Sequence, residues 1–352
     1  MGINTLAFNL VRIILLGIFS ACLTFILTPL WTNILYKYRL GKHIREDKDT
    51  PIFMSLHQKK EGTPTMGGVL IWGGVLIVTF LFFFLAKFFN GFWGKLNFVS
   101  RSQTWLPLAA MTGAAFVGLI DDLMGVFRIG PKGGGLRMRD KIIVYILIAM
   151  IGAWWFTQKL EYQTVHFPLI GDINLGVFYF LFFVFILVAT TFSANETDGL
   201  DGLLAGTALV VLGCLLVVAF VKGKYELSAF LATFIGALTA FLWFNIYPAR
   251  FFMGDTGAMA IGITVGVIAM LTDTSLYLPF FAFIWVIESL SVIIQKIYKK
   301  IKKKKLFLST PIHHHFEAIG WPETKVTMRF WIISAVVGLF GLALYFLDIF
   351  VV

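Results

Sequence analysis

The sequence predicts an all-α polytopic membrane protein. Of its 352 residues, 59% are hydrophobic and only 14% are charged, whereas a soluble domain carries about 25% charged residues. The apolar residues gather into runs that are long enough to cross a bilayer as helices. In chain order, the ten predicted transmembrane helices cover 10–34, 66–86, 104–120, 142–158, 174–192, 203–221, 227–247, 258–272, 276–295 and 330–350.

These helices fill the chain, so we expect one transmembrane catalytic domain over residues 1–352. The first run is long and has no small-residue cleavage site close behind it, which favours a retained helix over a signal peptide. The runs 104–120 and 258–272 are short and are the weakest of the ten. Cys22 and Cys214 each stand alone inside an apolar run, which favours buried thiols over a disulfide or a metal site.

Positive charge predicts how the chain is oriented. Of the 29 Lys and Arg residues, 22 fall in the loops after the first, third, fifth, seventh and ninth predicted helices. Cytoplasmic loops of membrane proteins are enriched in Lys and Arg, so these odd-numbered loops are expected in the cytoplasm. With ten helices, both termini are then expected in the periplasm. The net charge of +10 is then explained by topology and by attraction to anionic membrane lipids. Nucleic-acid binding is a poor explanation, because the charge is dispersed over loops beside the membrane.

The segment 192–203 carries the most informative polar residues. It contains Asn195, Glu196, Asp198 and Asp201, and no Lys or Arg to neutralise the three acids. Uncompensated carboxylates at a membrane boundary are costly, and a divalent metal ion is one source of the missing charge. The spacing of three places Asp198 and Asp201 on one helical face, at the expected start of the sixth predicted helix.

Other polar clusters lie on the same predicted side. The segment 60–68 combines Lys60 and Thr65 with glycines that let backbone N–H groups approach an anion, although a Pro/Gly turn before a helix is an alternative. Asp121 and Asp122 end the third predicted helix, where the helix dipole disfavours anions; a solvated helix end is the other interpretation.

Four further groups complete this side. Asp255, which also suits an N-cap, lies between Gly254 and Gly257, close after Asn245 and Phe252. Glu288 and Gln295 belong to the ninth predicted helix, where Glu288 is deep enough to need a partner. A run of seven Lys over 296–305 is expected to rest on an anionic leaflet. The adjacent histidines His313, His314 and His315 can grip phosphate oxygens or pass protons from a loop.

Together these segments resemble the polyprenyl-phosphate N-acetylhexosamine-1-phosphate transferases. The resemblance extends over essentially the whole chain. It is carried by the Asp121-Asp122 pair, by the Asn-x-x-Asp-Gly-x-Asp-Gly segment 195–202 and by the Gly-Asp-x-Gly loop 254–257. The segment Pro-Ile-His-His-His-Phe-Glu, 311–317, is similar to the muramoyl-pentapeptide branch of the family.

The resemblance implies a reaction and a site. Undecaprenyl phosphate and UDP-MurNAc-pentapeptide would give lipid I and UMP with Mg²⁺, at the cytoplasmic face of the bacterial inner membrane. The resemblance implies catalytic roles for Asp121, Asp122, Asp255 and His313. The three aspartates are also the expected metal ligands. Family members are often dimers, so the resemblance also implies a homodimer. The expected substrate-binding residues are Lys60, Thr65, Lys141, Asn195, Asp198, Asp201, Asn245, Phe252, Gln295, His314 and His315.

One departure and two rival functions remain open. The family pair is usually Asp-Asp-x-x-Lys, but Gly125 stands in the fifth position here, so Arg128, Lys132 or Lys141 would have to supply the charge. One rival is a sister enzyme that uses UDP-GlcNAc. The other is an ion-coupled transporter, which would place paired acids near mid-membrane in interrupted, repeated helices; only Glu288 fits that pattern.

Overall fold

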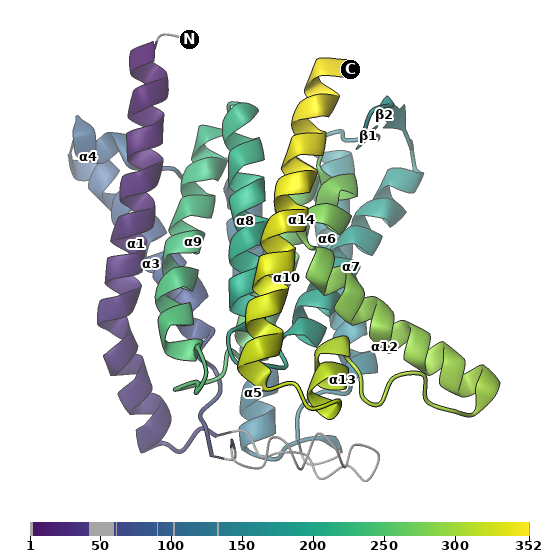
Figure 1. Cartoon of the computed structure of the whole chain (residues 1–352). Helices are drawn as coiled ribbons and strands as arrows, with labels where there is room; N and C mark the ends of the chain where they lie inside the picture. Colours follow the sequence, from purple (N-terminus) through teal and green to yellow (C-terminus); the bar gives the residue numbers. More distant parts are fainter. Residues whose placement is uncertain are drawn as a thin grey trace.

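The computed structural model describes residues 3–41, 60, 62–89, 91–100, 103–131 and 134–351. Helices run side by side in a bundle, and one short β-hairpin caps it (Figure 1). The helices and strands are α1 (Ile3–Lys37), α3 (Val69–Phe88), α4 (Phe92–Lys95), α5 (Trp105–Val126), α6 (Met138–Gln158), β1 (Thr164–Phe167), β2 (Gly171–Asn174), α7 (Phe178–Thr197), α8 (Leu203–Val221), α9 (Tyr225–Asn245), α10 (Asp255–Leu271), the 3₁₀ turn η3 (Ser275–Tyr277), α11 (Leu278–Phe281), α12 (Phe283–Lys302), α13 (Ile312–Ala318) and α14 (Glu323–Val351).

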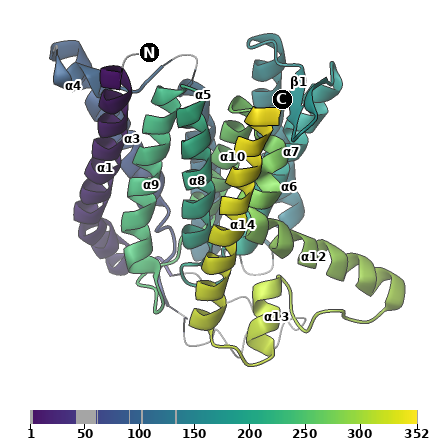
Figure 2. The same ribbon diagram turned by 45° about the horizontal axis from the view of Figure 1, so that its top comes forward.

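Both chain termini lie at one end of the bundle (Figure 1). We call this the termini end; the β-hairpin and α4 lie there too. The other end carries α13 and the turn between α7 and α8, and we call it the site end (Figures 1 and 2). Because the long helices alternate in direction, segments far apart in the sequence meet at the site end.

Each predicted transmembrane run overlaps at least one helix, and the run 203–221 matches α8 at both bounds. Eight helices in the described part of the chain are long and apolar enough to cross a membrane, which makes this a polytopic membrane protein. A bent pair of helices gives a ninth crossing if it counts as one, and α10 has only 17 residues. Every residue of α10 is buried, so this short helix is surrounded by protein.

The prediction of one continuous helix over 276–295 is wrong. The chain breaks between Ser275–Phe281 and Phe283–Lys302 with a bend of 89°, and α12 then leaves the bundle sideways (Figures 1 and 2). The outer part of α12 is amphipathic: Ile293, Ile297 and Ile301 are exposed, while Lys299, Lys300 and Lys302 occupy its last turn. An apolar run cannot reveal such a break, because apolar residues continue on both sides of it.

Two smaller expectations also fail. A β-hairpin follows α6, with Val165 of β1 paired to Ile173 of β2, although the sequence predicted only helices. Cys22 is exposed on the surface of α1, whereas Cys214 is buried as expected. An apolar run predicts insertion in the bilayer but not which of its faces meets protein and which meets lipid.

The hairpin is held to the bundle by His166. Its Nδ1 lies 2.7 Å from Oδ1 of Asp172, and its Nε2 lies 2.5 Å from Oδ2 of Asp348 in α14. Asp348 also accepts hydrogen bonds from the Tyr277 hydroxyl and from the Leu169 N–H. Burial lowers the pKa of His166, but the hydrogen bonds and charges of the two carboxylates outweigh burial and raise this pKa above its ordinary value.

The stability of the protein should therefore depend on pH through His166. Since the pKa is higher in the folded state, this contribution is fully present below the ordinary pKa of about 6.5 and is lost as pH rises through the raised value. We expect the thermal midpoint in detergent to fall over this range, and His166→Asn to remove that part of the fall. An identical pH profile for both proteins would contradict the assignment.

Candidate active site

Lys141 joins two acids at the site end of the bundle. Its Nζ lies 2.9 Å from Oδ2 of Asp121 in α5 and 2.7 Å from Oδ2 of Asp255 in α10. All three side chains are less than a tenth exposed. One ammonium therefore compensates one of two buried negative charges, if both carboxylates are ionised. We call these three residues the Lys141 centre.

Close packing of the helices brings the Lys141 centre together. A Cβ added to Gly118 would lie only 2.4 Å from the backbone oxygen of Asp255, so this glycine lets α5 approach the start of α10. Asn195 near the end of α7 donates to Oδ1 of Asp255 at 2.5 Å. The backbone N–H of Leu136 donates to Oδ1 of Asp121 at 2.5 Å. The carboxylates of Asp121 and Asp255 are thus each oriented by a second hydrogen-bond donor besides Lys141.

Asp122 binds the start of α10, whereas the adjacent Asp121 pairs with Lys141. It is fully buried, and its Oδ2 accepts a 3.0 Å hydrogen bond from the Thr256 N–H in the first turn of α10. A Cβ at Gly254 would lie 2.4 Å from the same oxygen, so the glycine makes this approach possible. Thr65 contacts the other oxygen of Asp122 at 3.5 Å. A carboxylate at a helix N-terminus is electrostatically favourable, and Asp122 supports α10 in this way.

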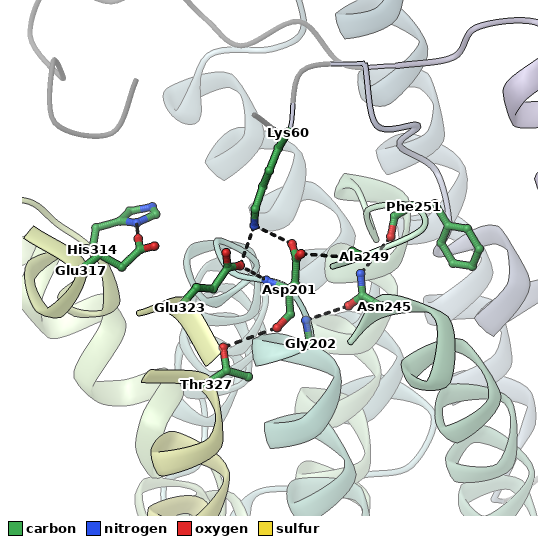
Figure 3. A network of polar contacts seen from close by, with 10 residues as sticks. All are labelled: Lys60, Asp201, Gly202, Asn245, Ala249, Phe251, His314, Glu317, Glu323 and Thr327. Atoms are coloured by element: carbon green, nitrogen blue, oxygen red, sulfur yellow. Dashed lines mark hydrogen bonds and ion pairs between the residues drawn. The ribbon is translucent and has the colours of Figure 1, made fainter. Parts of the chain in front are cut away.

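Lys60 links a second pair of acids (Figure 3). Its Nζ lies 2.7 Å from Oδ1 of Asp201 and 2.5 Å from Oε1 of Glu323, at the start of α14. The rings of Tyr247 and Phe252 lie 5.8 Å from the same ammonium. Burial lowers the pKa of Lys60, but the two carboxylates outweigh burial and raise this pKa above its usual range. Lys60 is therefore held as a cation.

The prediction that Asp198 and Asp201 share a helical face is wrong. Asp198 is the C-cap residue directly after α7, and Asp201 lies in the turn before α8 begins at Leu203. The adjacent Gly202 has a left-handed conformation, with φ of 74°, which ends any helix through the segment. We call residues 198–202 the α7–α8 turn.

Backbone and side-chain hydrogen bonds hold the α7–α8 turn from several sides (Figure 3). The N–H of Asp201 donates to Oε1 of Glu323 at 2.7 Å, and Oδ2 of Asp201 accepts from the Ala249 N–H at 2.9 Å. Asn245 accepts from the Gly202 N–H at 3.0 Å and donates to the Phe251 oxygen at 2.9 Å. Asn245 thus positions the turn and the 249–252 loop together.

The three histidines lie in a helix, α13, and not in the expected loop. Each Nδ1 has a different partner: Glu288 at 2.9 Å for His313, Glu317 at 2.7 Å for His314, and the Leu308 N–H at 3.3 Å for His315. Pro311 directly precedes α13 and suits a helix start, a signal that the sequence contained. The partner that Glu288 was expected to need is His313.

Two further sequence predictions can be placed. Gln295 accepts from the N–H groups of Leu306 and Phe307 and donates to the Phe307 oxygen, so its amide holds the chain that follows α12. Of the three basic residues considered in place of a Lys at position 125, Lys141 contacts the acids. Lys132 lies outside the described residues.

Sequence reasoning missed several contributors. Glu323 completes the Lys60 cluster, Glu317 pairs with His314, and the Leu136 backbone reaches Asp121. Glu323 could have been found from the sequence, because it is an acid just before the last apolar run. No sequence signal exists for a backbone donor such as Leu136, because every residue type except proline carries that N–H.

The Lys141 centre has the chemistry to hold a hard divalent cation. The described residues contain no group of three or more His, Cys, Asp or Glu suited to a metal ion. However, Mg²⁺ is usually bound by one or two carboxylates together with substrate phosphates and water. The carboxylates of Asp121 and Asp255 already converge on one cation, the Lys141 ammonium, and so fit that kind of site.

Known proteins match this chain over nearly its whole length. Residues 104–273 match the model of glycosyl transferase family 4, and residues 60–71 match signature 1 of the phospho-N-acetylmuramoyl-pentapeptide-transferases. A phospho-N-acetylmuramoyl-pentapeptide-transferase of Geobacillus sp. (strain WCH70) is 36% identical over 92% of this chain and 95% of its own. That of Thermodesulfovibrio yellowstonii is 35% identical over 97% of this chain and 94% of its own. That of Chloroflexus aurantiacus is 35% identical over 96% of this chain and 90% of its own.

The signature covers Lys60 and Thr65, and the family 4 match covers the Lys141 centre and the α7–α8 turn. At such identity over most of both chains, the relationship applies to the whole protein. The chain therefore belongs to the phospho-N-acetylmuramoyl-pentapeptide-transferase family.

Proposed function

We propose that this protein transfers phospho-MurNAc-pentapeptide from UDP-MurNAc-pentapeptide to undecaprenyl phosphate, giving lipid I and UMP in peptidoglycan synthesis. The observation that carries the proposal is the Lys141 centre, two acids and a lysine at the site end of a membrane bundle. A soluble nucleotide and a lipid phosphate can meet only at the boundary of the membrane. Membership of the family supports this choice of substrates.

In this reaction, an oxygen of the lipid phosphate attacks the phosphorus that is bonded to MurNAc. A new P–O bond forms, the pyrophosphate P–O bond breaks, and the electron pair leaves with UMP. A phosphate monoester has a second pKa of about 6, so the lipid phosphate is mostly ionised near neutral pH and needs no strong base. We favour direct attack; a two-step route through a phosphorylated aspartate is the alternative.

Charge is the main obstacle, because two anionic phosphates must approach each other beside buried acids. We propose that Asp255 and Asp121 hold Mg²⁺, with Asp122 as their neighbour, and that this ion supplies neutralising charge to the phosphates when bound. Lys141 supplies a second, permanent cation beside them. Asn195 orients Asp255 at 2.5 Å, which keeps one carboxylate oxygen engaged and the other directed to the shared cation.

The second cluster suits recognition of the nucleotide sugar. Asp198 and Asp201 belong to the α7–α8 turn, and Asn245 holds this turn through the Gly202 N–H (Figure 3). Phe252 lies beside the Lys60 ammonium. Lys60 and Thr65 lie in the segment that precedes α3 and can bind phosphate or sugar oxygens. His314, His315 and Gln295 extend this surface along α13 and α12, as the family resemblance implies.

The membrane arrangement follows from charge and fold together. We propose ten crossings, with the bent helix pair and α10 among them, in the bacterial inner membrane. The site end then faces the cytoplasm and both termini face the periplasm. The lysines at the end of α12 contact anionic lipids, and two copies of the chain form a homodimer.

Release of UMP from the purified protein tests the proposal. We expect Mg²⁺-dependent release when UDP-MurNAc-pentapeptide and undecaprenyl phosphate are both present, with removal of Mg²⁺ by EDTA stopping it and added Mg²⁺ restoring it. UDP-GlcNAc in place of the muramoyl nucleotide should give no lipid product. Turnover of UDP-GlcNAc alone would identify the sister enzyme, and absence of UMP with either substrate would reject the transferase.

The role of Asp255 can be tested separately. Asp255→Asn should reduce kcat by about 10²- to 10³-fold, the usual cost of removing one electrostatic group from a reacting centre, while the protein still inserts and folds. The matched control is Asp273→Asn, since Asp273 pairs with Lys222 at 3.5 Å in the connection after α10. Activity of Asp255→Asn close to that of the control would remove Asp255 from the proposed metal role.

A further inference from the structure

Glu288 and His313 form a buried pair beside the proposed substrate site. Oε2 of Glu288 lies 2.9 Å from Nδ1 of His313 and 3.5 Å from its backbone N–H. Both side chains are 0% exposed. In this structure His313 therefore has no surface through which it could touch a substrate.

The other side of the imidazole packs against the α7–α8 turn. A Cβ added to Gly199 would lie 2.2 Å from Nε2 of His313 and 2.7 Å from Cε1. Gly199 lies between Asp198 and Asp201 in the α7–α8 turn. The imidazole ring therefore packs directly against the backbone of this turn. The imidazole thus lies between a carboxylate of α12 and the turn.

Stability alone gives a weak reason for such a pair. A buried acid and imidazole lose their hydration, and replacing a buried ion pair with apolar residues of similar volume is often neutral or stabilising. A hydrogen bond to Nδ1, in contrast, fixes the orientation and the tautomer of a histidine, as it does for histidines in catalytic sites. The geometry here orients Nε2 toward Gly199.

We propose that Glu288 is a positioning residue, which holds His313 against Gly199 and thereby sets the α7–α8 turn for the nucleotide sugar. His313 then acts through the turn and not on the phosphates, which replaces the catalytic role expected from the sequence. The pair also ties the turn to α12, the helix that leaves the bundle after the 89° bend. This inference rests on the proposed function for its kinetic consequences only.

Substitutions at Glu288 separate positioning from packing. Glu288→Gln keeps an oxygen that accepts from Nδ1–H and from the backbone N–H, whereas Glu288→Leu fills similar space without an acceptor. We expect Glu288→Leu to raise the KM for the nucleotide sugar by roughly 10- to 100-fold, by analogy with the loss of the hydrogen-bond partner that orients a metal-ligating histidine. Glu288→Gln should stay within about fivefold of the native KM, because a neutral acceptor retains part of the hydrogen bond.

A second buried acid provides a matched control. Asp348 is 2% exposed and pairs with His166 through Nε2 at 2.5 Å, but at the termini end of the bundle. Asp348→Leu should lower the thermal midpoint and leave the KM for the nucleotide sugar unchanged. The KM for undecaprenyl phosphate should be the same in all these variants.

Two results would overturn the proposal. A folded Glu288→Leu protein with a native KM and kcat would show that the pair does not position the turn. Equal inactivity of Glu288→Gln and Glu288→Leu, with both folded, would show that the carboxylate itself takes part in the chemistry.

The tautomer of His313 can be measured without any activity assay, so the positioning role of Glu288 is tested separately from the transferase function. In ¹⁵N-histidine NMR spectra, His313 should show protonated Nδ1 in the native protein and in Glu288→Gln, and should lose this preference in Glu288→Leu. If the native protein releases no UMP, the transferase proposal fails while this test of the pair stands. If UMP is released but the tautomer preference does not depend on residue 288, the pair proposal fails alone.

Discussion

The sharing of one ammonium between two buried carboxylates organises the site end of this protein. Asp121 and Asp255 come from helices that are separated by more than a hundred residues, and Lys141 belongs to a third helix. Removing one partner from a buried ion pair leaves an uncompensated charge, at a cost of about 3–5 kcal/mol. Gly118 permits the close approach of α5 to the start of α10, and the Leu136 N–H gives Asp121 a second donor besides Lys141.

Lys60 likewise lies between two acids, Asp201 and Glu323 (Figure 3). The segment 195–201 connects the two clusters, since Asn195 in the last turn of α7 donates to Asp255 and Asp201 in the α7–α8 turn accepts from Lys60. Each cluster has two acids and one lysine. This surplus of negative charge is what the proposed divalent cation would compensate when an anionic substrate binds.

Sequence reasoning predicted the membrane class and the acids because both depend on residue type and local order. An apolar run such as 203–221 predicts its helix closely, and uncompensated acids such as Asp255 are conspicuous between apolar runs. It failed where tertiary packing decides the local structure. Spacing alone placed Asp198 and Asp201 on a helix, whereas Gly202 adopts a positive φ and ends it. The break after Phe281 depends likewise on packing against neighbouring elements, whereas Pro311 was a local signal for the helix that carries the histidines.

Family membership explains what the protein acts on, and the geometry explains how distant residues can act as one site. If Asp121 and Asp255 hold a divalent cation beside Lys141, anomalous scattering from a crystal of the full chain with Mn²⁺ and the nucleotide sugar will reveal it most directly. We expect one Mn²⁺ peak directly coordinated by carboxylate oxygens of Asp255 and Asp121. A peak bound only at Asp201 and Glu323, or none at the Lys141 centre with the nucleotide in place, would contradict it.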